Sequence, residues 1–174
     1  WCRGQPAAGR ARRPLVLAIR RFPDPILKQP TRPLGLVRHE TRQFIDQMVA
    51  TMRHHPRCVG LAAPQVGRPL RLAVMDATGH PKATTSHGLI VLVNPEILQA
   101  RGQVVHREGC LSVPDFTANV RRAEWVRLGA MDEEGRVREL VLEGFEAVIV
   151  QHEVDHLDGK LFLDRVANLR TDVF

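Results

Sequence analysis

Hydrophobic residues recur at helical spacing in two widely separated stretches of the chain. The first stripe, within 36–53, consists of Phe44, Ile45, Met48, Val49 and Met52. The second, near the carboxyl end, consists of Phe145, Val148, Ile149, His152 and His156. Spacings of three and four residues are typical of one face of an α-helix, and Gly159 is a suitable stop for the second stripe. We therefore expect one helix early in the chain and another near its end.

Between these two helices the hydrophobic residues form shorter runs that alternate with polar residues or are rich in β-branched ones, as in strands. These runs cover 70–75, 89–93, 103–106, 120–130 and 137–142. Residues 132–135 read Asp-Glu-Glu-Gly and predict a hairpin turn between the last two runs. Strands followed by a helix predict that the helix lies across an antiparallel sheet. The predicted fold class is α+β, with mostly antiparallel β-sheets packed around a C-terminal helix and a preceding N-terminal helix.

Length and composition are those of one domain. The chain has 174 residues, of which 44% are hydrophobic, enough to bury a core. The densest apolar run, 89–93, has five residues, whereas a transmembrane helix needs about 20, so no membrane partner is expected. Three cysteines are too few for a disulfide framework and favour a reducing compartment. We expect a basic N-terminal extension at 1–18 and a single domain at 19–174.

The chain is basic, with a formal net charge of +6 that comes from 22 arginines and only 3 lysines. A solvated basic exterior explains this charge, and weak attraction to ribosomal RNA is the functional alternative. No RNA-binding motif accompanies it, so no specific nucleic-acid partner is expected. The stretch 1–23 contains arginines but no acidic residue. This composition is typical of a basic tail on a cytoplasmic bacterial protein. It is also typical of the remnant of a transit peptide for a mitochondrion or plastid. Pro6 and Pro14 favour the tail.

Two histidines four residues apart lie within the second predicted helix. Residues 151–156 read Gln-His-Glu-Val-Asp-His, so His152 and His156 share one helix face and can bind one metal ion. Glu153 projects from the adjacent edge, where a carboxylate can act as a general base on water. An ordinary buried helix with two hydrogen-bonded histidines is the alternative. The helical stripe and the neighbouring carboxylate favour a catalytic metal site.

A third protein ligand is required, because catalytic zinc-type sites commonly use three and leave one position for water or substrate. Cys110 is the best candidate, since it follows the flexible Gly109 and precedes Pro114. A thiolate with two imidazoles suits Zn, Fe(II), Co or Ni. Taken alone, a single cysteine is more often a small core residue, and that alternative remains open at this point.

A run of small residues at 58–67 ends in a proline and an amide side chain. Small residues such as Gly60 let the backbone approach a ligand closely, and Gln65 can donate a hydrogen bond to a developing oxyanion. A tight structural turn explains the same run equally well. The segment by itself leaves both interpretations open.

Together, and in this order, the three segments resemble the peptide deformylase family. The family carries G-x-G-L-A-A-P-Q, then E-G-C-L-S, then Q-H-E-x-D-H. Residues 60–65, 108–112 and 151–156 match these motifs. The likeness extends into the flanks, from about 19 to about 166. Three motifs in the same order make the resemblance specific.

The resemblance implies a hydrolase that removes the formyl group from the N-terminal formylmethionine of newly synthesised polypeptides and releases formate. It implies that one divalent ion is held by Cys110, His152 and His156. Such an ion lowers the pKa of bound water from about 16 toward ~7, and the resulting hydroxide attacks the formyl carbon. Glu153 is then the general base and acid. The family suggests Fe(II) as the native ion, with Zn, Ni or Co as alternatives.

The resemblance also implies residues that hold the substrate. Gln65 and the backbone N–H of Leu111 receive the oxyanion, and Gly60 pairs with the substrate backbone. The pocket for the methionine side chain is lined by Val59, Leu111, Ile149 and His152. The partners are then N-formylmethionyl peptides on nascent chains, with weak ribosome association as an addition, and 19–174 is a single catalytic domain.

Two other classes of protein remain as alternatives. An H-E-x-x-H zinc peptidase usually takes its third ligand from a downstream carboxylate or histidine, which the upstream Cys110 does not match. A non-catalytic module with a structural metal needs four protein ligands and leaves Glu153 unexplained. Cys58 stands where many bacterial deformylases have a glycine, and it is the candidate fourth ligand of such a site. Plant and organellar members are similar here, with Cys-Val-Gly-Leu, which favours family variation instead.

Overall fold

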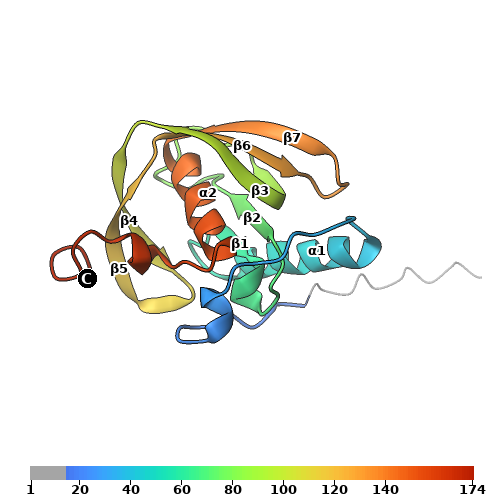
Figure 1. The fold of residues 1–174 in the computed structure, drawn as a ribbon, viewed down its shortest axis with the longest axis horizontal. Coiled ribbons are helices and arrows are strands. Elements are labelled where there is room, and N and C mark those ends of the chain that lie inside the picture. Colours follow the sequence, from blue (N-terminus) through green and yellow to red (C-terminus); the bar gives the residue numbers. More distant parts are fainter. Residues whose placement is uncertain (1–14) are drawn as a thin grey trace, which may run out of the picture.

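A computed structural model describes residues 15–174, and every statement below concerns them (Figure 1). Within these residues there are two α-helices, seven strands and three short 3-10 helices. The helices are α1 (His39–His54), α2 (Gly144–Leu157), η1 (Pro25–Lys28), η2 (Ala63–Val66) and η3 (Phe162–Arg165). The strands are β1 (Gly60–Ala62), β2 (Leu72–Asp76), β3 (Leu89–Arg101), β4 (Val104–Cys110), β5 (Val113–Arg122), β6 (Trp125–Met131) and β7 (Val137–Glu143).

All strand pairs within the sheets are antiparallel. Five strands form one sheet in the order β1-β2-β3-β6-β7, and β4 and β5 form a separate two-stranded sheet. The predicted hairpin is present, because Met131 pairs with Val137 across the turn at 132–135. The predicted α+β class, with antiparallel sheets around a C-terminal helix, is confirmed.

The expectation of one strand over 120–130 is wrong. The chain leaves the small sheet at Arg122, the last residue of β5, and enters the large sheet at Trp125, the first residue of β6. Val120 is fully buried in one hydrophobic cluster and Val126 in another. Both strands alternate apolar and polar residues, so the sequence pattern does not show where the chain passes from one sheet to the other.

The second predicted helix is α2, and it begins and ends close to the expected residues. Asp158 is its C-cap, and Gly159 adopts a left-handed conformation (φ 72°) that a residue with a β-carbon rarely takes. The first predicted helix, α1, begins at His39, three residues later than expected, and Leu36 stays largely exposed.

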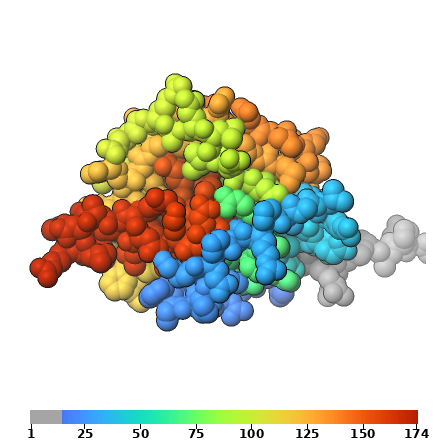
Figure 2. Space-filling model, in the orientation of Figure 1, coloured from blue at the N-terminus to red at the C-terminus, as the bar shows by residue number. Residues whose placement is uncertain are grey.

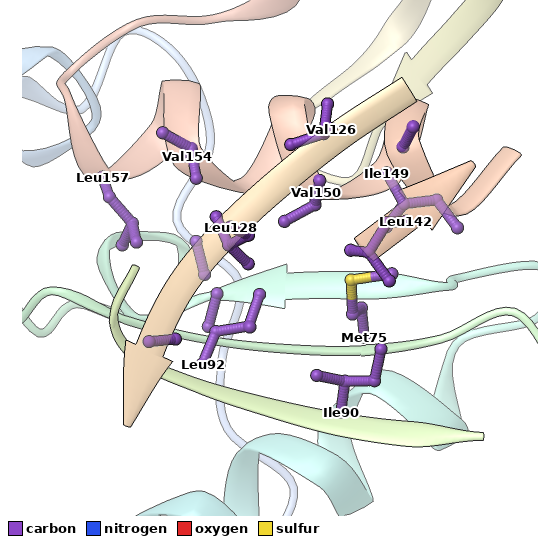
Figure 3. Close-up of a cluster of buried hydrophobic side chains, with 14 of the residues drawn as sticks. Met75, Ile90, Leu92, Val126, Leu128, Leu142, Ile149, Val150, Val154 and Leu157 are labelled. Carbon is purple, nitrogen blue, oxygen red and sulfur yellow. The ribbon is translucent and has the colours of Figure 1, made fainter. Parts of the chain in front are cut away.

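The main hydrophobic core lies between α2 and the large sheet (Figure 3). Val150, Val154 and Leu157 of α2 point toward Leu92 and Leu128 of the sheet in this view. Because α2 is apolar on most of its circumference, it is buried rather than amphipathic. This burial fixes the position of every polar side chain that α2 carries, including the two histidines.

Two further hydrophobic clusters hold the remaining elements. One packs α1 against β1 and β2 through Met48, Met52 and Leu61. The other packs β5 against η3 through Val120 and Phe162. The residues after α2 lie against the first described part of the chain, seen as red beside blue in Figure 2. Lys28 Nζ donates to Asp164 Oδ2 there at 2.6 Å.

The expected boundary of the domain at 18/19 stays a prediction, since most of 1–18 lies outside the described residues. Within the described part, the Leu17 N–H donates to Thr51 Oγ1 of α1 at 2.9 Å. None of the helices within 15–174 is both long and apolar enough to cross a membrane.

Candidate metal centre

Three side chains that can bind a metal meet where β4 ends beside α2. Cys110 is the last residue of β4, and His152 and His156 lie one turn apart on α2. One ligand atom of each lies within 4.8 Å of the others, and Cys110 Sγ is 3.2 Å from His156 Nε2. The structure thus brings together the three ligands that the sequence suggested.

Glu108 orients the first histidine. Its Oε2 lies 2.8 Å from His152 Nδ1, which leaves Nε2 of that ring for a metal. The carboxylate also accepts two hydrogen bonds from Arg122, at 2.7 and 2.9 Å. The carboxylate of Asp155, which lies on the same helix, pairs with Arg122 and Arg165.

This second layer is a buried network of charges. The side chains of Glu108, Arg122 and Asp155 are each at most 5% exposed, and only Arg165 reaches the surface. Burial favours the neutral carboxyl of Glu108, but Arg122 and His152 outweigh it and hold its pKa at about 2. Glu108 is therefore an anion that holds the His152 ring through Nδ1, the nitrogen that does not face the metal.

The protonation state of Cys110 suits a metal ligand. Burial opposes ionisation of the thiol, but His156 and His152 beside it outweigh burial and hold its pKa well below its usual value. The site thus offers a thiolate and two imidazoles, a donor set that fits a divalent transition metal. Cys58 is not part of this group, and its thiol instead donates to the Gly60 carbonyl at 3.1 Å.

Glu153 is buried beside this group and is not one of its three ligands. Burial raises the pKa of its carboxyl to about 7, against the opposing effect of the two imidazoles. Its Oε2 accepts no hydrogen bond from any residue in 15–174. A buried carboxylate with a pKa near neutrality can accept a proton and return it.

The side-chain amide nitrogen of Gln65 lies beside the metal-binding residues. The Ala62 N–H donates to Gln65 Oε1 at 2.9 Å, which fixes the direction of the amide. Gln65 Nε2 then lies 3.3 Å from Cys110 Sγ and 3.2 Å from Ser112 Oγ. The carboxamide is therefore a fixed donor beside the metal ligands.

The small residues at 60–62 form β1, which the sequence pattern did not predict as a strand. β1 pairs with β2 on one side and is the edge of the large sheet, so its other side has no partner strand in the described chain. An unpaired strand edge of this kind can pair with an extended peptide. β1 lies next to α2, and a β-carbon on Gly60 would be 2.3 Å from Glu153 Oε1.

A pocket of about 530 Å³ opens onto the metal centre. The expected pocket residues Val59, Gly60, Leu111 and Ile149 all line it, and so does His152. Sequence reasoning missed other lining residues, among them Arg57, His80, Lys82, His106, Arg107, Phe145 and Val148. The apolar stripe of α2 pointed to Phe145 and Val148, but no local pattern identified the others.

Comparison with known proteins gives one consistent family. The sequence model of the polypeptide deformylase family matches residues 16–172. A peptide deformylase of Mesorhizobium japonicum is 41% identical over 162 residues, which cover 92% of this chain and 88% of that protein. One from Alkalilimnicola ehrlichii is 44% identical over 155 residues, covering 89% and 84%.

Solved structures agree. A peptide deformylase from Legionella pneumophila superimposes with a TM-score of 0.81 at 40% identity, covering 90% of this chain and 89% of that one. A Met-Ala-Ser-bound class I type b peptide deformylase from Acinetobacter baumannii gives a TM-score of 0.82 at 38% identity, covering 88% and 99%.

Proposed function

This chain belongs to the polypeptide deformylase family, and from that premise we propose which of its residues carry out the reaction. The protein is a metal-dependent hydrolase that removes the formyl group from the N-terminal formylmethionine of new polypeptides and releases formate. The family does not favour the zinc-peptidase or structural-metal alternatives. One observation carries the assignment of roles: three metal-binding side chains meet at a pocket that Cys110, His152 and the buried carboxylate of Glu153 line.

Cys110, His152 and His156 would hold one divalent ion. Because the pKa of the Cys110 thiol is low, its sulfur has a lone pair free for the ion. Because Glu108 pairs with His152 Nδ1, the lone pair of Nε2 on that ring is free as well. When bound, the ion supplies Lewis acidity that makes water a nucleophile at neutral pH and polarises the formyl oxygen. Glu108 keeps the His152 ring in one orientation during the reaction, and Arg122 keeps Glu108 in place.

Glu153 accepts the proton of the attacking water and returns it to the nitrogen of the departing amine. Its pKa of about 7 matches both steps at neutral pH, because a group near the working pH gives up a proton as readily as it takes one. Its Oε2 has no hydrogen-bond partner within residues 15–174, so this oxygen is not committed to another residue there. Burial keeps bulk water from competing for the carboxylate.

Gln65 and the backbone N–H of Leu111 stabilise the charge that develops on the formyl oxygen. Gln65 Nε2 is supported in this role by its fixed direction and its closeness to Cys110. Leu111 follows Cys110 directly and lines the pocket. Losing one such donor typically costs about 3–4 kcal/mol in the barrier.

The substrate backbone pairs with the free edge of β1 at Gly60, and the methionine side chain enters the pocket. Val59, Leu111 and Ile149 line that pocket and offer apolar surface to the thioether. Pairing along β1 holds the formyl carbon beside Glu153, since Gly60 and Glu153 are in direct contact.

The native ion is Fe(II) in this proposal. A thiolate with two imidazoles also fits Zn, Ni or Co, so the donor set alone does not select one of these ions. Metal analysis of protein purified without oxygen from its natural source tests the choice. Iron at one atom per chain is expected, and stoichiometric zinc with full activity would contradict it.

We further propose weak ribosome association and a cytoplasmic location. The net charge of +6 supports weak attraction to ribosomal RNA, which a co-sedimentation assay at low and high salt can test. Location in a mitochondrion or plastid is the alternative, in line with the Cys-Val-Gly-Leu segment at 58–61. Fusing residues 1–23 to a reporter protein tests it, because import into an organelle would contradict the cytoplasmic proposal.

The activity itself is tested with formyl-Met-Ala-Ser and protein prepared anaerobically with Fe(II). Formate release that a chelator abolishes and Fe(II) restores is expected, with the Met-Ala-Ser product left intact. Cleavage of a peptide bond in unformylated Met-Ala-Ser would favour the peptidase alternative. Folded, metal-loaded protein that releases no formate would contradict the proposed function.

A further inference from the structure

Among the described residues, the exposed charged side chains that line the pocket are all positive. Arg57, Lys82 and Arg107 line the pocket and are exposed to solvent. The acidic residues that line it, Glu108 and Glu153, are both buried and belong to the metal centre. We call Arg57, Lys82 and Arg107 the cationic rim.

A generally basic surface does not explain the cationic rim, because other hollows of the molecule are mixed in charge. Beside Trp125, Arg101 is accompanied by Glu124 and Glu143. The hollows at Arg71 and at Arg42 likewise include several carboxylates each. Of these four hollows, the one at the metal centre is alone in lacking an exposed carboxylate.

The three rim residues come from separate parts of the chain. Arg57 lies between α1 and β1, Lys82 between β2 and β3, and Arg107 within β4. In residues 15–174, no carboxylate lies within ion-pair distance of any of them. Their charges are therefore available to a ligand.

Neighbouring residues hold two of the rim side chains in place. Lys82 Nζ donates to the Arg107 carbonyl at 3.2 Å and lies 5.8 Å from the centre of the Phe145 ring. Arg107 Nε donates to Thr117 Oγ1 at 2.9 Å, and its guanidinium lies 3.5 Å over the Phe174 ring. Fixed charges lose less conformational entropy on binding than mobile ones.

We propose that the cationic rim selects formylated peptides with Asp or Glu in the residues that follow formylmethionine and disfavours Lys or Arg there. This inference rests on the proposed function, which holds the formyl group at Glu153 and the first side chain in the pocket. An extended peptide advances about 3.3 Å per residue, so its second to fourth residues leave through the mouth. Exposed charge pairs of this kind contribute about two- to five-fold each to binding.

Three peptides with amidated carboxyl ends test the preference: formyl-Met-Asp-Glu, formyl-Met-Asn-Gln and formyl-Met-Lys-Lys. We expect kcat/KM for formate release to be about ten-fold higher for the acidic peptide than for the neutral one, and lowest for the basic one. Raising the salt from 0.05 to 0.5 M should bring the ratio close to one, because exposed charges are screened.

The variants Arg57→Glu and Lys82→Glu test the residues themselves. Comparing the acidic-to-neutral ratio within each variant cancels any general loss of activity. We expect the ratio to fall below one in the double variant. Arg38→Glu is the matched control, since Arg38 is exposed, has no ion-pair partner in the described chain and lies outside the pocket. It changes the net charge by as much as either single rim substitution does and should keep the wild-type ratio.

Three results would overturn the inference. Equal kcat/KM for all three peptides, with normal formate release, would remove the charge preference while leaving the proposed function intact. Loss of ribosome or RNA binding in the double variant, with an unchanged peptide ratio, would assign the rim to RNA instead. Absence of formate from every peptide would reject the proposed function and this inference together.

Discussion

The backbone of Gly60 lies directly against the carboxylate of Glu153. A β-carbon on Gly60 would be 2.3 Å from Glu153 Oε1 and 2.8 Å from Cδ, closer than nonbonded atoms come. The strand edge that is proposed to hold the substrate and the proposed base are therefore in contact. Because glycine has no β-carbon, the strand and the Glu153 carboxylate can lie this close together.

Gly60→Ala is expected to lower kcat/KM for formyl-Met-Ala-Ser by about 100-fold, because the new methyl group displaces the carboxylate from its position. Metal content should stay at that of the wild type, since the variant touches none of the three ligands. Gly35→Ala is the matched control, because a β-carbon on Gly35 meets no atom within 4 Å. Equal activity of the two variants would contradict this account of Gly60.

Cys110→Ser is expected to weaken metal binding by more than about 100-fold. A hydroxyl does not ionise at neutral pH, and even residues that only orient ligands are worth roughly 10- to 100-fold in affinity. Competition with a chromophoric chelator measures the affinity. Cys58→Ser is the control and should bind metal normally, because the Cys58 thiol is directed to the Gly60 carbonyl. Unchanged affinity in the Cys110 variant would exclude Cys110 as a ligand.

The Cys58 thiol is expected to react slowly with iodoacetamide. Burial, with help from the Glu153 carboxylate, raises its pKa to about 12, so almost none of it is thiolate at pH 8. Its rate of alkylation should keep rising with pH beyond 10, where an ordinary thiol has already levelled off. Mass spectrometry of the peptide that contains Cys58 measures the rate. Rapid alkylation at pH 8 would contradict the raised pKa.

Much of the fold was predictable, because the signals for it are local. The helical stripe and Gly159 fixed α2 closely, and the turn at 132–135 fixed the hairpin of β6 and β7. The change of sheet at Ala123 and Glu124 was not predictable, because the alternation on either side is alike. Which sheet a strand joins is decided by contacts with residues far away in the sequence.

Arg122→Leu is expected to destabilise the protein by about 3–5 kcal/mol, because it leaves the buried carboxylates of Glu108 and Asp155 without their shared partner. Denaturant unfolding measures the free energy of unfolding. Arg165→Leu is the control: its side chain is 44% exposed, so its loss should cost about 1 kcal/mol or less. Similar losses in both variants would contradict a special role for Arg122.

The ligands of the candidate site were predictable from motifs, but their supports were not. His152, His156 and Glu153 share one helix, so their spacing alone suggested a site. Arg122 is one of 22 arginines, and nothing in its immediate sequence distinguishes it from the exposed ones. Its burial follows from the meeting of β4, β5 and α2, which is a property of the tertiary structure.

The most direct test of the account is the Glu153→Gln variant, prepared anaerobically with Fe(II) beside the wild type. Gln is nearly the same size as Glu but cannot accept the proton. We expect one metal ion per chain in both proteins and a fall in formate release from formyl-Met-Ala-Ser of about 10²- to 10⁴-fold in the variant. Near-normal formate release by the variant at equal metal content would contradict the role of Glu153 as the base.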